Sequence, residues 1–375
     1  MRIVIKIGTS SLTLDNETGI NRELIAKIVN LVANLRKEGH QVLLVSSGAV
    51  GLGGKRLGWI EKPSRITLYQ AAASVGQILL ARVYEECFAP YKITIGQVLL
   101  TRLGMQQKEH YLSARMTLTE LLKLGVVPII NENDVVADEE IKFSDNDYLA
   151  ALVSELVSAE HLFILTDTEG LFTSDPRFDP EAKLISVVPE INAEVEVRAG
   201  QKSTHWGTGG MVTKIEAAKM ATAFGTTVHI LTSRHPEKVI EVLKGSSHGT
   251  TFLPRQNAED ARKAWLAYGI LPKGKLVIDN GAFSALGTGR SLLPIGIKKV
   301  QGKFSRGQAL EICYEEQEHI RVVAKGITKY DSEDLRKIKG RLSEEIESIL
   351  GYSYGNSAIH RDDLVMLTPC ENVAE

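Results

Sequence analysis

The sequence predicts an α/β fold with a mostly parallel central sheet, followed by a small, mostly β second domain. Short apolar runs of strand type alternate with segments of helical periodicity, which is the pattern of a layered parallel sheet. Small or polar residues follow several of these runs directly, as expected where ligands bind. The pattern changes near residues 250–275, where shorter strand-like pieces and glycine-rich turns begin.

The first strand is predicted at Arg2–Ile7, directly after Met1, so we expect no signal peptide before the fold. Further short apolar runs are typical of strands that are buried on both faces of a parallel sheet. They are found at residues 41–46, 93–99, 126–130, 161–165 and 227–231.

Helices are predicted between these strands. Residues 21–38 carry one apolar stripe with spacings of three and four, and Gly39 follows at the place where helices favour glycine. The other predicted helices lie around 66–88, 111–124, 146–158 and 211–223. Because each helix can connect two strands by a crossover, neighbouring strands are expected to be parallel.

The second domain is predicted from four short strand-like pieces and one charged helix near 332–348. The pieces lie at residues 275–278, 296–300, 309–312 and 321–324. We therefore predict a first domain over 1–260, a second domain over 273–360 and a C-terminal tail over 361–375.

Composition excludes several classes of protein. The net charge is −2, so any nucleic-acid binding has to be local. No apolar run approaches the ~20 residues of a membrane span, and we expect no membrane association. The three cysteines, Cys87, Cys313 and Cys370, are isolated, which favours a reducing cytoplasm over a disulfide framework. The histidines lack metal-ligand spacing and no C-x-x-C occurs, so no Cys/His metal site is expected.

Four loops directly follow predicted strands and are small or polar: residues 8–10, 46–48, 131–134 and 166–167. In open α/β sheets, ligands bind outside the carboxyl ends of the strands. We therefore expect these loops to line one site.

A cradle for polyphosphate is predicted at 207–214, which reads GTGGMVTK and precedes a helix. A glycine-rich run exposes backbone N–H groups, and the helix N-terminus and Lys214 add positive charge. The segment is not a Walker A loop, because G-x-x-x-x-G-K-[ST] is absent. Considered by itself, Lys6 at the end of the first strand is typical of a surface lysine. Together with Lys214 it could stabilise the charge of a transferring phosphoryl group.

Asp145-Asn146-Asp147 opens a predicted helix and has two interpretations. Acidic residues there are favourable for capping alone. In a functional site, Asp147 would hold a catalytic lysine charged and in register, and Asn146 would donate to substrate. Ser47 and Asp134 could bind an anion and an ammonium group, or could simply cap a helix and a turn.

The sequence contains no recognisable Ser-His-Asp or Cys-His arrangement for nucleophilic catalysis. That fits an acceptor carboxylate of pKa ~4.3, which is ionised at neutral pH and needs no general base.

These residues resemble the amino acid kinase family, in its branch that phosphorylates glutamate. The resemblance rests on the motifs at 5–10, 46–49, 128–134, 145–147, 165–167 and 207–214. Motifs at 291–297, 302–307 and 330–335 resemble a PUA domain, which many members of this branch carry. The likeness covers residues 1 to about 367, and the order of the motifs is more specific than any one of them.

The resemblance implies an eight-stranded, three-layer α/β/α sandwich that transfers the γ-phosphoryl of ATP to the γ-carboxylate of L-glutamate, the first step of proline biosynthesis. Mg²⁺ would offset the charge of ATP. Catalytic roles fall on Lys6, Lys214 and Asp147, and glutamate binding falls on Ser47, Asp134 and Asn146. The implied ATP-binding residues are Lys6, Thr166, Asp167, Thr208, Gly209, Gly210, Met211, Val212, Thr213 and Lys214.

The resemblance further implies inhibition by proline, a homo-oligomer, a cytoplasmic location and a reductase that consumes the labile acyl phosphate. Two alternatives stay open. The acceptor could be aspartate or N-acetylglutamate, because the sequence does not fix the depth of the pocket. The PUA-like domain could bind RNA through basic residues at 298–306 and 336–341, although nearby acidic residues favour a solvated charged face.

Overall fold

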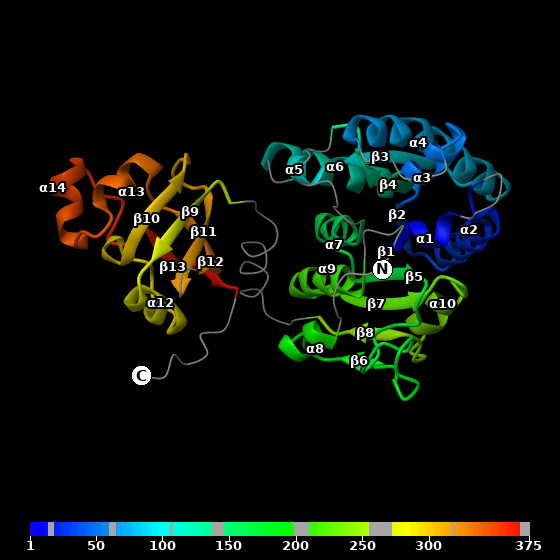
Figure 1. The fold of residues 1–375 in the computed structure, drawn as a ribbon. Helices are drawn as coiled ribbons and strands as arrows, with labels where there is room; N and C mark the ends of the chain where they lie inside the picture. The colour runs from blue at the N-terminus through cyan, green and yellow to red at the C-terminus, as the bar shows by residue number, and fades with distance from the viewer. Residues whose placement is uncertain are drawn as a thin grey trace. The chain divides into compact units, whose positions relative to one another are not determined.

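The computed structural model describes residues 1–13, 19–59, 65–105, 108–136, 146–198, 210–254, 272–316 and 319–367. The chain divides into two compact units, Met1–Gln256 and Asn257–Glu375 (Figure 1). Each unit has its own sheet and its own hydrophobic core.

The sheet of the first unit has the strand order β3-β4-β2-β1-β5-β7-β8-β6 within the described residues. Its neighbouring strands are parallel except β7 and β8, which are antiparallel. The strands are β1 (Arg2–Ile7), β2 (Gln41–Ser46), β3 (Ile95–Leu100), β4 (Val127–Glu132), β5 (His161–Thr166), β6 (Val187–Val188), β7 (Thr227–Thr232) and β8 (Thr250–Phe252).

Two groups of helices cover the two faces of this sheet (Figure 1). On one face, α2 (Arg22–Lys37) contacts both α4 (Ile66–Phe88) and α10 (Lys238–Leu243). On the other, α7 (Asn146–Leu156) contacts both α6 (Lys108–Lys123) and α9 (Met211–Ala223). The predicted α/β fold with three layers and a mostly parallel sheet is therefore confirmed. Shorter elements are α1 (Thr9–Leu12), α3 (Ala49–Arg56), η1 (Ala89–Tyr91), α5 (Arg102–Met105) and α8 (Ala193–Arg198).

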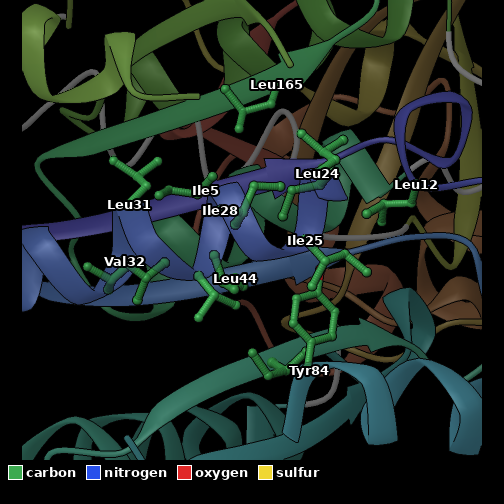
Figure 2. Close-up of a cluster of buried hydrophobic side chains, with 14 of the residues drawn as sticks. Ile5, Leu12, Leu24, Ile25, Ile28, Leu31, Val32, Leu44, Tyr84 and Leu165 are labelled. Atoms are coloured by element: carbon green, nitrogen blue, oxygen red, sulfur yellow. The ribbon is translucent and has the colours of Figure 1, made fainter. Parts of the chain in front are cut away.

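The core of the first unit forms where α2 packs on the sheet (Figure 2). Burying these side chains supplies the main favourable term for folding, roughly 25 cal/mol per Å² of apolar surface. The side chain of Asn21 caps α2 by accepting from the N–H of Leu24. The apolar stripe predicted for this helix is buried throughout: Leu24, Ile25, Ile28, Val29, Val32 and Leu35.

Several short elements of this unit were not predicted, and β6, β8 and α3 show why. Strands β6 and β8 have two and three residues, too few for a readable alternation. Helix α3 contains three glycines, which disfavour a helix by roughly 1 kcal/mol each relative to alanine. It is stabilised by packing against α4, which an analysis of local propensity cannot detect.

The second unit contains a five-stranded sheet of order β10-β9-β11-β12-β13 in its described part. Its strands are β9 (Gly274–Ile278), β10 (Ile297–Gly302), β11 (Ala309–Glu316), β12 (His319–Thr328) and β13 (Ile359–Met366). Strand β13 was not predicted, and the predicted domain end at residue 360 falls inside it. The predicted boundary near 260–273 lies largely within 255–271, outside the described residues.

The prediction of a single helix near 332–348 is wrong. The structure has α13 (Ser332–Ile338), then η5 (Ser343–Glu345) and α14 (Ile346–Leu350). Gly340 separates them with φ +72°, a left-handed conformation that ends a helix. The remaining elements are α12 (Asn280–Gly287) and η4 (Pro294–Gly296).

Across the part of the chain that the structure describes, no helix combines the length and the apolar character needed to cross a bilayer.

Candidate active site

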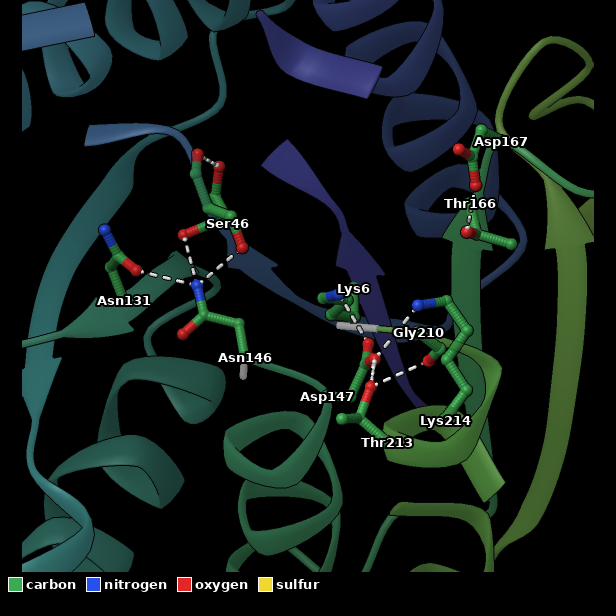
Figure 3. A network of polar contacts seen from close by, with 11 residues as sticks. Lys6, Ser46, Asn131, Asn146, Asp147, Thr166, Asp167, Gly210, Thr213 and Lys214 are labelled. Carbon is green, nitrogen blue, oxygen red and sulfur yellow. Dashed lines mark hydrogen bonds and ion pairs between the residues drawn. The ribbon is translucent and has the colours of Figure 1, made fainter. Parts of the chain in front are cut away.

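Two lysines meet one carboxylate at the carboxyl edge of the first sheet (Figure 3). The Nζ of Lys6 lies 2.5 Å from Oδ1 of Asp147, and the Nζ of Lys214 lies 3.2 Å from Oδ2 of the same carboxylate. All three residues are buried, with exposed fractions of 2%, 6% and 0% for Lys6, Lys214 and Asp147. The structure thus brings together the three residues that the sequence analysis assigned to catalysis.

Each member of this centre comes from a different element. Lys6 is the penultimate residue of β1, between Val45 of β2 and Ile164 of β5 in the register of the sheet. Asp147 lies in the first turn of α7, and Lys214 lies in the first turn of α9. Because α7 packs against both β1 and α9, its first turn can contact both lysines.

The charge of the centre favours an anionic ligand. Two ammonium groups and one carboxylate leave one positive charge in a nearly dry environment. Buried ions lose most of their hydration, so both lysines pair with Asp147, and the remaining positive charge attracts a further anion. A phosphoryl group that develops negative charge is a suitable partner.

The glycine-rich turn reaches this centre at Gly210, which is the N-cap of α9 and has no side chain to cap the N–H groups of the first turn. Met211 and Val212 form the first positions of the helix. The Oγ1 of Thr213 lies 2.9 Å from the Gly210 carbonyl and 3.1 Å from Oδ2 of Asp147. Free N–H groups at a helix N-terminus bind phosphate. Two predicted nucleotide-binding residues, Thr208 and Gly209, lie outside the described residues.

A second group of polar contacts surrounds Asn146, the neighbour of Asp147 (Figure 3). Its Nδ2 lies 2.7 Å from Oγ of Ser47, 2.9 Å from Oδ1 of Asn131 and 3.2 Å from the carbonyl of Ser46. The two N–H bonds of this amide face three acceptors, which restrain its orientation. The structure therefore brings two of the predicted substrate-binding residues, Ser47 and Asn146, into contact.

The third predicted substrate-binding residue, Asp134, lies two residues beyond the end of β4 and is partly exposed. It is close enough to Tyr69 for their charges to interact: burial first, and then the carboxylates of Asp134 and Glu132, raise the pKa of the Tyr69 phenol. A direct contact between Asp134 and Asn146 is not among the hydrogen bonds of the described residues.

Thr166 is the last residue of β5, and Asp167 follows it directly. In the sheet, β5 lies next to β1, on the side opposite β2. The Thr166 hydroxyl donates to Oδ1 of Asp167 at 3.0 Å. Figure 3 shows this pair apart from the lysine centre, at the end of β5 and on the other side of β1 from the Asn146 group. The two predicted nucleotide residues therefore line the same edge of the sheet without contacting Asp147 directly.

The residues that support the Asn146 group were not among the predicted site residues. The amide of Gln77 accepts from Nδ2 of Asn131 at 2.8 Å, and the hydroxyls of Ser46 and Tyr84 lie 2.9 Å apart. Asn131 and Ser46 lie at the carboxyl ends of β4 and β2, in the segments 131–134 and 46–48 that were expected to line one site. Gln77 and Tyr84 lie inside helix α4, where nothing in the sequence distinguishes them from other helix residues.

The residues of the site fit a magnesium ion that arrives with a nucleotide. Within the described ranges, no group of three or more His, Cys, Asp or Glu could hold a metal ion. The carboxylate of Asp147 is already shared by two lysines. Mg²⁺ commonly binds proteins through one or two carboxylates, several waters and the phosphates of a substrate. The donor set of the described residues suits that mode.

Comparisons find similarity to known proteins in both units of the chain. The model of the amino acid kinase family matches residues 1–232, and that of the PUA domain matches residues 274–350. A glutamate 5-kinase of Nostoc punctiforme is 47% identical over 366 residues, which cover 97% of this chain and 99% of that protein. A glutamate 5-kinase of Microcystis aeruginosa is 47% identical over 369 residues, covering 98% and 96%. Among solved structures, a UMP kinase from Bacillus anthracis aligns with 68% of this chain and 96% of its own, at a TM-score of 0.48 and 14% identity.

Proposed function

Since the chain belongs to the amino acid kinase family, we propose that it transfers the γ-phosphoryl group of ATP to the γ-carboxylate of L-glutamate, the glutamate 5-kinase reaction. The observation that carries the proposal is the buried centre in which Lys6 and Lys214 share Asp147. The relatives that are 47% identical over almost the whole chain support glutamate as the acceptor.

The two lysines stabilise the transferring phosphoryl group. Phosphoryl transfer passes through a loose transition state with negative charge on the transferred oxygens. Lys6 and Lys214 lie on opposite oxygens of one carboxylate, so Asp147 fixes the spacing of two ammonium groups in advance. Fixed positive charge of this kind needs no reorganisation during the reaction, and one such donor is commonly worth 10²–10³ in rate.

The Asn146 group orients the acceptor. Its polar contacts with Ser47 and Asn131 adjoin the lysine centre, because Asn146 and Asp147 are consecutive in α7. Asp134 supplies a carboxylate for the substrate ammonium. The attacking γ-carboxylate is already ionised at neutral pH, so the site needs orientation more than a general base.

The N-terminus of α9 and the pair of Thr166 and Asp167 hold ATP in this proposal. Bound Mg²⁺ would reduce the negative charge of the triphosphate. Lys214 and the free N–H groups of α9 then need to neutralise only the remaining charge.

The test is ADP release with Mg·ATP in the presence of hydroxylamine, with L-glutamate, L-aspartate and N-acetylglutamate compared as acceptors. An acyl phosphate reacts with hydroxylamine to form a hydroxamate, so the product reports the chemistry and the acceptor together. We expect hydroxamate with L-glutamate. Preference for another acceptor would contradict the assignment of glutamate, and no turnover with any of the three would contradict phosphoryl transfer to a carboxylate.

Lys214→Ala separates catalysis from folding in the same assay. We expect its kcat to fall at least 100-fold, which is about 2.7 kcal/mol of barrier. Lys219→Ala is the matched control, because Lys219 lies on the same helix and pairs with Glu196, away from Asp147. The control should keep its kcat within about twofold.

Further properties implied by the family likeness stay predictions: inhibition by proline, a homo-oligomer, a cytoplasmic location and a reductase that takes the acyl phosphate. RNA binding by the PUA domain stays the alternative to a solvated charged face, and a salt-sensitive shift with structured RNA at low ionic strength would detect it.

A further inference from the structure

We propose that Thr213 is a positioning residue whose hydroxyl takes the place of Lys214 on Asp147 when that lysine engages the phosphoryl group. This inference rests on the proposed function and extends it to a residue of the glycine-rich segment. It starts from one geometric fact: Thr213 and Lys214 approach the same oxygen, Oδ2 of Asp147.

The two oxygens of Asp147 are held differently. Oδ1 is bound by Lys6 at 2.5 Å. Within the described ranges, Oδ2 is approached by two donors at longer distances, the ammonium of Lys214 at 3.2 Å and the hydroxyl of Thr213 at 3.1 Å. The contact with Lys6 is therefore the closer one, and Lys214 is the lysine better suited to move toward a ligand.

A threonine hydroxyl has one hydrogen and can donate to one acceptor at a time. In the described part of the chain, the Oγ1 of Thr213 has two acceptors in reach, the Gly210 carbonyl at 2.9 Å and Oδ2 of Asp147 at 3.1 Å. Rotation of the O–H bond, without movement of the rest of the side chain, is sufficient to move the hydrogen bond from the Gly210 carbonyl to Asp147.

The exchange matters because Asp147 is fully buried. A buried carboxylate oxygen that loses its donor pays a desolvation penalty. When Lys214 turns to the phosphoryl group, Oδ2 would lose its ammonium partner. Thr213 can then donate to Oδ2, which lowers the cost of releasing the lysine. The effect falls on the rate of transfer, which distinguishes this role of the hydroxyl from the ATP binding that the family resemblance implies for Thr213.

The test compares Thr213→Val, which keeps the shape and removes the hydroxyl, with Thr213→Ser, which keeps the hydroxyl. We expect Thr213→Val to lower kcat about 10-fold, with the KM for ATP and the Kd for a non-hydrolysable ATP analogue unchanged within about twofold. Thr213→Ser should stay within about threefold of the wild type. Thr213→Ala replaces Thr213→Val if the valine variant does not fold.

The matched control is Thr222→Val on the same helix. Thr222 is also buried, and its hydroxyl donates to the Ala218 carbonyl at 2.7 Å, without contact to Asp147. We expect an unchanged kcat. A fall equal to that of Thr213→Val would show that any hydroxyl lost from α9 has the same effect, and would overturn the proposal.

A double-mutant cycle tests the link to the lysine. In a Lys214→Ala background, Thr213→Val should have little further effect on kcat, because the exchange no longer occurs. Additive effects would assign Thr213 to a structural role, and a raised KM for ATP with unchanged kcat would assign it to nucleotide binding. Both results overturn the proposal, whereas an inactive wild type would refute the proposed function itself.

Discussion

Gly53→Ala is expected to destabilise the first unit and to weaken binding of the acceptor. Helices α3 and α4 meet through backbone at two glycines. A Cβ added to Gly53 would lie 1.7 Å from the carbonyl oxygen of Ala72, and one added to Gly76 would lie 1.7 Å from the carbonyl oxygen of Ala49. Contacts of a Cβ below 3.0 Å essentially do not occur, so the helices would have to separate by about 1.3 Å.

The magnitude follows from two opposing terms. Overpacking a core costs about 1–3 kcal/mol, and the upper end applies here because backbone atoms cannot rotate away. Replacing a glycine inside a helix by alanine returns about 1 kcal/mol. The net loss of about 2 kcal/mol corresponds to a fall in Tm of roughly 4–8 °C for a unit of this size.

Thermal unfolding followed by circular dichroism measures this difference, with Gly54→Ala as the control on the same helix. A Cβ at Gly54 would lie 3.6 Å from its nearest neighbour, in the ring of Trp59, which is an ordinary contact. Gly54→Ala should keep or raise the Tm. Equal Tm values for the two variants would refute the reasoning.

The same displacement should reach the site, because α3 begins directly after Ser47 and Gly48. We expect Gly53→Ala to raise the KM for glutamate more than the KM for ATP. A selective rise for ATP would contradict the assignment of Ser47 to the acceptor side.

Three further predictions concern single side chains. Asp147→Asn should lower kcat at least 100-fold, because two buried ammonium groups lose their shared carboxylate; a kcat within tenfold of the wild type would contradict this. Asn146→Ala should raise the KM for glutamate while the Kd for ATP stays constant, measured by steady-state kinetics and calorimetry. Burial, and then the nearby His161, lower the pKa of His229 to about 3 in the folded protein. The unfolded chain therefore binds a proton at His229 more readily than the folded chain does. This contribution to the free energy of unfolding is fully present above pH ~6.5 and falls by about 1.4 kcal/mol per pH unit as the pH falls toward 3. In urea unfolding, the free energy of unfolding of His229→Gln should fall less steeply with pH than that of the wild type.

The layered fold could be predicted because its signals are local. Strands β1 and β2 and helices α4 and α9 have the predicted bounds, since each is an apolar run or stripe between clear breaks. The elements that were missed depend on contacts distant in sequence. Helix α3 exists because Gly53 and Gly76 allow two backbones to meet, and β13 exists because β12 provides a partner for it.

The site could be predicted in part for the same reason. Lys6 and Lys214 were singled out because each adjoins a glycine-rich turn, and Asn146 and Asp147 because they open a helix. That both lysines bind one carboxylate depends on α7 packing between β1 and α9, which periodicity does not reveal. Gln77 and Tyr84 support the acceptor side from inside α4 and have no signal in the sequence.

The first turn of α7 joins the two halves of the site. Asn146 holds the acceptor side and Asp147 holds the lysines, and the two residues are consecutive. A substitution beneath this turn therefore moves both groups at once and should change the KM for glutamate together with kcat. A substitution at the far end of either group, such as Gln77 or Thr213, should change only one of them. Plotting kcat against the KM for glutamate over such a series would separate the two classes, and a single line through all variants would contradict the division of the site proposed here.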